Sequence, residues 1–330
     1  MKKKFLLILL FGMLFINTGC FNKTEKNIVD SMKKEISKLD AYHITGELEI
    51  VNNEDKFSYD VDVAYQKDDN FKVSLKNKTN NHEQIILKNN EGVYVLTPSL
   101  NKSFKFQSDW PYNNSQIYLL QTLMNDIQND KDKKIEQTKD GFIIHTKVDY
   151  PNNKNLTKQK IYTDKNGTIL KVEILNNSDA IKMKMKFNNI DKTAKFNDKY
   201  FNLDNNMTEE TVAQSVKEIE DIIYPMYMPE NTYLKSQDTI SLENGERVIL
   251  TFAGDNPFML IEETVAIPED NELTVVYGNP EMLIGTIGTV TENSASWINN
   301  GIEYYAVSDT MDQEQLLEVV NSISVIPVGK

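Results

Sequence analysis

Polar and apolar residues alternate along much of the first two thirds of the chain. The clearest runs are residues 57–65, where aromatic and valine side chains alternate with Asp60 and Asp62, and residues 181–187, where isoleucine, methionine and phenylalanine alternate with lysines. A period of two places successive side chains on opposite sides of a β-strand. These runs therefore predict strands with one buried face and one wet face.

The strands expected from this alternation cover residues 44–50, 57–65, 71–75, 85–87, 93–96, 103–106, 142–148, 161–163, 169–174 and 181–187. Turn residues separate them, and Asn166-Gly167 is a strong signal for a two-residue hairpin. The order predicts an antiparallel meander.

Two stretches change to a helical period. Apolar residues recur at helical spacing within residues 24–40 and again within residues 115–129. The second stretch places four apolar residues on one face, namely Ile117, Leu120, Met124 and Ile127. Because a sheet with one apolar side must cover it, these helices are the expected cover. The prediction for residues 28–207 is an α+β fold, namely an antiparallel half-barrel covered by a helical lid.

The apolar face of this sheet is expected to be mostly core. It could also line a groove for an acyl chain or a peptide, since concave apolar surfaces with flexible methionines suit such ligands. The candidate lining residues are Tyr59, Val61, Val63, Tyr65, Phe71, Val73, Met183, Met185 and Phe187.

A break in charge near residue 207 predicts a domain boundary. Residues 208–330 carry 4 basic against 22 acidic side chains, whereas residues 20–207 carry 29 lysines against 27 acidic ones. A linker helix is expected over residues 208–224, followed by a smaller acidic α+β domain over 225–330 whose closing helix starts near Asp312. Such an acidic half disfavours nucleic acid as a partner, because phosphate is also negative.

The order of elements resembles a known family. The segments "AYHITGELEI", "EGVYVLTP" and "KQKIYTDKNGTILKVEI" look like the fold of the LolA lipoprotein carriers and the sigma-factor regulator RseB, and more closely like the Gram-positive sporulation lipoproteins of the YdcC and GerS kind. The carriers latch their lid with arginine, but residues 1–246 contain none. A carrier cycle of that type is therefore not expected here.

The N-terminus has the layout of a secretory signal peptide over residues 1–19. Three lysines precede an apolar run of about a dozen residues, shorter than the roughly 20 that span a bilayer. Thr18-Gly19-Cys20 resembles a bacterial lipobox, which implies a diacylglycerol-modified Cys20 followed by a polar tether over residues 20–27. The alternative is a soluble secreted protein with an idle thiol. Lipidation predicts an anchor on the extracytoplasmic face of the cell membrane.

Enzyme activity is not expected. The histidines His43, His82 and His145 lie on different elements without a second metal ligand at a suitable spacing, and no nucleophile elbow or phosphate-binding loop occurs. Asp60 and Asp62 fall on the wet face of their strand. No metal or cofactor is predicted. Trp110 and Tyr112 could contact a partner, although burial under a loop is the simpler expectation.

These observations lead to one hypothesis and two alternatives. The resemblance implies a lipid-anchored binding or scaffold protein of sporulation or germination, docking a cell-wall enzyme such as an N-acetylmuramoyl-L-alanine amidase, with a possible homodimer. The alternatives are a lipid or lipoprotein carrier, and an RseB-like stress sensor that acts on an anti-sigma factor.

Overall fold

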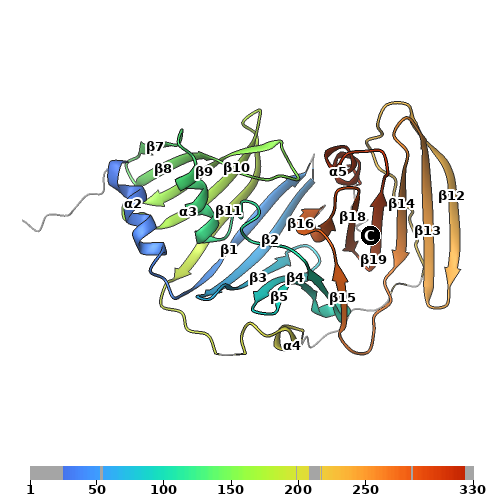
Figure 1. Cartoon of the computed structure of the whole chain (residues 1–330), viewed down its shortest axis with the longest axis horizontal. Helices are drawn as coiled ribbons and strands as arrows, with labels where there is room; N and C mark the ends of the chain where they lie inside the picture. Colours follow the sequence, from blue (N-terminus) through green and yellow to red (C-terminus); the bar gives the residue numbers. More distant parts are fainter. Residues whose placement is uncertain are drawn as a thin grey trace, which may run out of the picture.

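The computed structural model describes residues 25–52, 55–197, 199–207, 216, 218–283 and 285–323. The described chain is mostly β, with two sheets and few helices (Figure 1). The predicted signal peptide, Cys20 and the first residues of the predicted tether lie outside the described residues. No helix in the described part has the length and apolar character needed to cross a membrane.

The first sheet has 12 strands in the order β15-β6-β5-β4-β3-β2-β1-β11-β10-β9-β8-β7. Its strands are β1 (Ala41–Asn52), β2 (Asp55–Gln66), β3 (Asn70–Asn77), β4 (Glu83–Asn89), β5 (Gly92–Thr97), β6 (Lys102–Phe106), β7 (Lys134–Gln137), β8 (Gly141–Lys147), β9 (Leu156–Asp164), β10 (Ile169–Asn176), β11 (Ile181–Asp191) and β15 (Glu272–Val276). Strands β1–β6 and β7–β11 form two meanders that join where β1 pairs with β11. The expected antiparallel meander is confirmed, and only the pairing of β15 with β6 is parallel.

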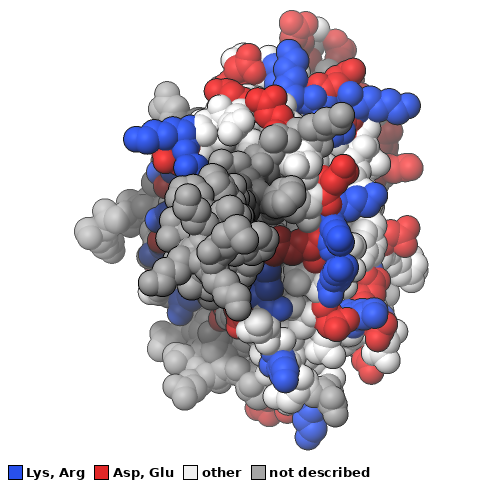
Figure 2. Space-filling view, turned by 90° about the vertical axis from the view of Figure 1, so that its left-hand side faces the viewer, with Lys and Arg blue, Asp and Glu red and all other residues white. Residues whose placement is uncertain are grey.

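Helices α2 (Glu25–Ile36) and α3 (Leu120–Asn129) pack on one face of this sheet, here called the helix-covered face. Their residues Ile28, Met32, Leu123 and Ile127 join the same buried cluster as Leu48 of β1. Figure 1 shows both helices in front of strands β7–β11. The end that bears α2 has lysines and acidic side chains interspersed, without a patch of one sign on its described surface (Figure 2).

The helix predicted over residues 115–129 begins only at Leu120. Ser115 is held by a distant segment: its N–H donates to the Asp149 carbonyl (2.7 Å) and its hydroxyl accepts from the Asp149 N–H (2.9 Å). Because this pairing satisfies the backbone, residues 115–119 stay outside the helix. The N-terminal helix likewise ends at Ile36 rather than near residue 40.

The opposite face of strands β2–β5 is also covered. Phe201 and Met207, from the segment that contains α4 (Leu203–Asn206), pack with Leu87, Tyr94 and other buried residues of this face. The sequence pattern did not predict this second cover, since it treated that face as wet.

The second sheet has seven strands in the order β12-β13-β14-β19-β18-β17-β16, with α5 packed on it. Its elements are β12 (Thr232–Leu242), β13 (Gly245–Gly254), β14 (Phe258–Thr264), β16 (Asn279–Leu283), β17 (Thr286–Val290), β18 (Ser294–Asn299), β19 (Ile302–Val307) and α5 (Gln313–Asn321). Helix α5 begins with a capping box between Asp312 and Gln315. It buries Leu316 and Val320, and Ile323 just after it is buried too, as predicted.

The linker helix expected over residues 208–224 lies largely outside the described residues. Where the structure describes it, at Val216 and residues 218–224, the chain is not helical. The N–H groups of Ile219 and Ile223 donate instead to the carboxylates of Glu246 and Glu262, both at 2.9 Å. The prediction of a helix there was wrong, because these carboxylates replace the helical carbonyl acceptors.

The two sheets do not divide the chain at a single point. Strand β15 belongs to the acidic half in sequence but lies at the edge of the first sheet, where it pairs with β6 (Figure 1). Its approach is fixed by Asn101, whose side-chain amide donates to the Pro268 carbonyl (2.8 Å) and whose carbonyl accepts from the Glu272 N–H (2.8 Å). The seam between the sheets is therefore extensive.

Candidate functional site: the seam between the two sheets

The residues expected to line a groove all lie on or beside the apolar core of the first sheet. Tyr65 and Met183 are half-buried there. The other seven are buried, namely Tyr59, Val61, Val63, Phe71, Val73, Met185 and Phe187. The four lid residues Ile117, Leu120, Met124 and Ile127 are buried as well. The structure thus fills the helix-covered face with side chains of its own chain.

Part of this filling comes from the second half of the chain. Ile287 of β17 joins the core of the first sheet, and Met282 of β16 packs against it. The hairpin β16–β17 therefore closes one end of the helix-covered face.

Gln84 of β4 anchors this hairpin. Its side-chain amide donates to the Ile287 carbonyl (3.1 Å), while its side-chain oxygen accepts from the Ile287 N–H (2.6 Å) and from the Thr286 hydroxyl (2.8 Å). One buried side chain thus satisfies a donor and an acceptor that would otherwise be orphaned at the seam. Nothing in the local sequence marks Gln84, because its partners lie about 200 residues away.

Glu281 lies beside this anchor. Its carboxylate accepts from the side-chain amides of Asn152 (2.7 Å) and Asn114 (3.3 Å). Burial raises the pKa of the Glu281 carboxyl to about 7, and the two amide donors oppose that rise. Within the described part, no second titratable side chain is hydrogen-bonded to these two amides. We therefore interpret Glu281 as a buried carboxyl that holds the seam together.

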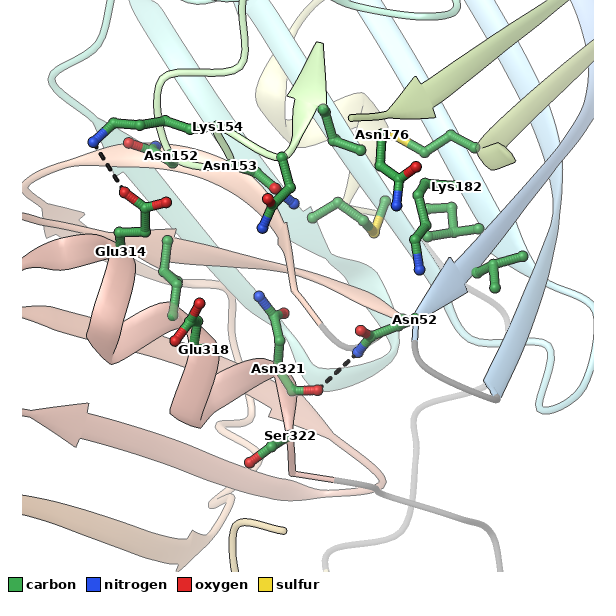
Figure 3. Close-up of a pocket in the computed structure, with 18 of the residues that line it drawn as sticks. Asn52, Asn152, Asn153, Lys154, Asn176, Lys182, Glu314, Glu318, Asn321 and Ser322 are labelled. Atoms are coloured by element: carbon green, nitrogen blue, oxygen red, sulfur yellow. Dashed lines mark hydrogen bonds and ion pairs between the residues drawn. The ribbon is translucent and has the colours of Figure 1, made fainter. Parts of the chain in front are cut away.

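A cavity of about 460 Å³ opens at the end of the seam (Figure 3). Its walls come from β1, β10, β11, the loop before β9 and helix α5. At its rim the ammonium of Lys154 lies 3.0 Å from the Glu314 carboxylate, and the side-chain amide of Asn52 donates to the Asn321 carbonyl (3.0 Å). Of the candidate groove residues, Met183 lines this cavity. The cavity itself was not predicted from the sequence, because its walls meet only through the tertiary structure.

Strand β15 forms an exposed edge of the first sheet. Three apolar side chains at alternate positions are open to solvent, with exposed fractions of 49% for Leu273, 55% for Val275 and 70% for Tyr277. A long apolar edge strand offers a template on which another strand can pair. The place of this strand in the first sheet was not predicted from the sequence.

The two aromatic residues proposed as partner contacts differ in their exposure to solvent. Trp110 is buried and packs edge-on against Phe71, with ring centroids 6.0 Å apart. Tyr112 is 55% exposed, donates its hydroxyl to Asp69 and carries the Lys88 ammonium 4.8 Å above its ring. Of the two, only Tyr112 is available to a partner.

The histidines remain apart. His43 pairs with Asp62 (2.8 Å) and His145 with Glu136 (3.6 Å), while burial lowers the pKa of His82. Within the described ranges no group of three metal-ligating side chains occurs. Asp60 is occupied by Lys78 at 3.1 Å, so Asp60 and Asp62 each have their own partner.

Comparison with known proteins decides the family. Residues 1–201 match the family model described as "Sporulation protein YdcC-like". The chain is 32% identical over 332 residues to "Sporulation protein YdcC" of Bacillus subtilis (strain 168), and the match covers 98% of each sequence. The chain belongs to the YdcC-like family of sporulation proteins. The resemblance to this family that the sequence indicated is thereby confirmed.

Several solved structures share lower similarity with this YdcC-like chain. MucB in the MucA/MucB complex of Pseudomonas aeruginosa gives a TM-score of 0.34 at 12% identity, over 90% of this chain and 98% of that one. The structure of the CwlD amidase from Clostridioides difficile in complex with the GerS lipoprotein gives 0.31 at 18% identity, over 53% and 97%. A LolA superfamily protein of Nitrosomonas europaea gives 0.32 at 11% identity, over 56% and 99%. With these TM-scores below 0.5, membership of the family rests on the sequence matches.

Proposed function

We propose that this YdcC-like protein is a lipid-anchored extracytoplasmic scaffold that acts in sporulation or germination by docking a cell-wall enzyme. The anchor would be Cys20, which follows the apolar run and the small residues Thr18 and Gly19. Acyl chains contribute about 0.8 kcal/mol per buried methylene, so two or three of them hold a protein durably on a membrane. The family supports the setting, and the sequence of the N-terminus supports the anchor.

The observation that carries the docking role is the edge strand β15. Its outer side has no neighbouring strand within the described chain, and Leu273 and Val275 of the strand, with Tyr277 just after it, are exposed to solvent. A partner strand could pair with this backbone while its side chains pack on the apolar row. Glu269 and Asp270, just before the strand, favour a partner with basic residues beside its own strand. Glu272 at the start of β15 is already paired with Lys102 (3.5 Å).

The proposed partner is a cell-wall amidase of the N-acetylmuramoyl-L-alanine type. The complex of the CwlD amidase with the GerS lipoprotein is the precedent for such a pair. A lipid carrier would instead need an open apolar face, and in this chain the helix-covered face is filled by Ile287, Met282 and the covering helices. We therefore prefer the scaffold to the carrier.

A pull-down from sporulating cells tests this proposal. Val275→Lys places a charge in the exposed apolar row, and it is expected to abolish recovery of a wall-modifying enzyme that the unaltered protein retains. Leu170→Lys on β10 is the matched control, because Leu170 is 48% exposed but lies away from the edge. The control should recover the enzyme as well as the unaltered chain does.

The anchor is tested in the same cells by labelling with a fatty acid. Incorporation into the unaltered chain and none into Cys20→Ala is expected. If the unaltered chain recovered no wall-modifying enzyme, the docking role would be wrong even with the anchor in place.

A further inference from the structure

The cavity at the end of the seam has a polar wall made of side-chain amides. Asn152, Asn153 and Asn155 line it from the loop before β9, and Asn176 lines it from the end of β10. Asn153 and Asn155 each carry a donor and an acceptor, the same pair that a peptide group presents. Asn152 already donates to Glu281, and the Asn176 oxygen already accepts from Ser178 and Ala180, so these two amides offer the cavity chiefly their other group. A wall of this kind suits a ligand that contains amide groups.

Two opposite charges face this cavity from different elements. Lys182 lies on β11 and Glu318 on helix α5, and both are among the residues that line the space in Figure 3. Lys154 and Glu314 at the rim are paired with each other, but neither Lys182 nor Glu318 takes part in an ion pair of the described chain. The cavity therefore offers one cation and one anion that are free to meet charges on a ligand.

The floor of the cavity is apolar. Phe57, Met183, Met282 and Leu317 contribute to it, so both sheets and helix α5 meet there. Methionine side chains adapt to different apolar shapes because they are unbranched and flexible. A volume of about 460 Å³ falls within the range of small-molecule sites.

We propose that this cavity binds a short zwitterionic peptide. Its carboxylate would lie beside Lys182, its free amino group beside Glu318, its amide along the asparagine wall and one apolar side chain on the floor. This inference is independent of the docking edge, because β15 contributes no residue to the cavity. A peptide site at the seam adds small-ligand recognition to a protein proposed to work as a scaffold.

Other ligand classes fit the same walls less well. An acyl chain has no groups for the four asparagines, and a neutral sugar has no charges for Lys182 and Glu318. A ligand with both ends charged uses every wall of the cavity. The acyl-chain alternative is included in the test through decanoate, whose competition with the dipeptide would contradict the proposal.

The test is titration calorimetry on the full-length chain purified in detergent. The probes are alanyl-leucine with free ends, its N-acetyl form, its C-terminal amide and decanoate. The free dipeptide should bind about tenfold more tightly than either capped form, since each lost contact is a charge-assisted hydrogen bond. Decanoate should not compete.

Two variants assign the charges. Lys182→Met should lower affinity for the free dipeptide about tenfold and remove its preference over the amide. Glu318→Gln should do the same for the preference over the N-acetyl form. Lys186→Met on the same strand and Glu292→Gln on the second sheet are matched controls, because both residues are exposed and outside the cavity.

Three other results would overturn the proposal. They are the absence of saturable binding by the free dipeptide, equal binding of the capped forms, and equal losses in the control variants. Melting curves of all four variants separate a loss of binding from a loss of folding, so an unfolded variant is replaced by Lys182→Gln or Glu318→Ala, which also remove the charge. A failed peptide test would leave the pull-down result unaffected, since that experiment depends on β15.

Discussion

Individual buried polar residues hold the seam and the segment that leads into the second sheet. The Gln84 side chain hydrogen-bonds to both the N–H and the carbonyl of Ile287, as a neighbouring strand would. Glu262, which is fully buried on β14, accepts a hydrogen bond from the Ile223 N–H. A buried polar group of this kind is stabilising only while its partner is present. Neither role could be predicted from sequence, because each depends on a partner that arrives through the tertiary fold.

Glu262 makes the stability of the second sheet depend on pH. Burial raises the pKa of its carboxyl from 4.5 to about 7. Between those values the folded chain binds a proton that the unfolded chain has lost, so this group's contribution to stability is lost as pH rises from about 4.5 to about 7. Glu262→Gln keeps an acceptor for Ile223 but removes the titration.

We therefore expect Glu262→Gln to gain about 1–3 kcal/mol in unfolding free energy relative to the unaltered chain between pH 5 and pH 8. Urea denaturation at a series of pH values measures this difference. Glu292→Gln, at an exposed position, is the control for the loss of one negative charge. A flat difference for Glu262→Gln would show that its carboxyl titrates normally.

At the scale of elements, periodicity located most strands and placed two helices, while contacts set their ends. Helix α3 starts late because Ser115 pairs with Asp149, and the connector at residues 218–224 is not helical because carboxylates take its N–H groups. The hairpin β16–β17 shows the same dependence. Its turn at Gly285 adopts a φ of 76° and lies against the Phe57 ring.

Gly285→Ala is expected to destabilise the chain by about 1–3 kcal/mol. A Cβ there would collide with the Phe57 ring, and the positive φ itself disfavours alanine by about 1 kcal/mol. Thermal and urea denaturation measure the loss. In a Phe57→Leu background the same substitution should cost about 1 kcal/mol, and an unchanged cost there would mean that the ring is not the obstacle.

At the scale of the whole molecule, the two halves form one continuous structure. The second half contributes strand β15 to the first sheet and the apolar residues Met282 and Ile287 to its core. The strong charge difference between the halves does not prevent this. The seam combines apolar contacts and amide hydrogen bonds with a few charged groups that have partners, such as Glu281 beside two amides and Lys154 paired with Glu314. The break in charge near residue 207 therefore marks a change in surface charge. It does not separate the hydrophobic cores of the two halves, which are in contact.

A fragment that ends at residue 207 should therefore be less stable than the full chain. Removing the second half exposes apolar residues under the hairpin, such as Leu48 and Ile86, and orphans Gln84. We expect a lower melting temperature and binding of a hydrophobic dye, measured by fluorescence. Equal melting temperatures without dye binding would show that the seam does not support the first sheet.

The sequence by itself determined the β-rich meander, the covering helices, the burial of the apolar stripe and membership of a sporulation family. Those features are encoded locally, in the period of apolar residues, in turns such as Asn166-Gly167 and in the amino-acid sequences of the strands. Only the tertiary structure decided that β15 crosses to the first sheet, that Gln84 holds β17, that Tyr112 and not Trp110 is exposed, and that amides and opposite charges surround one cavity. These outcomes join residues up to about 200 positions apart, and no local period carries information about such partners.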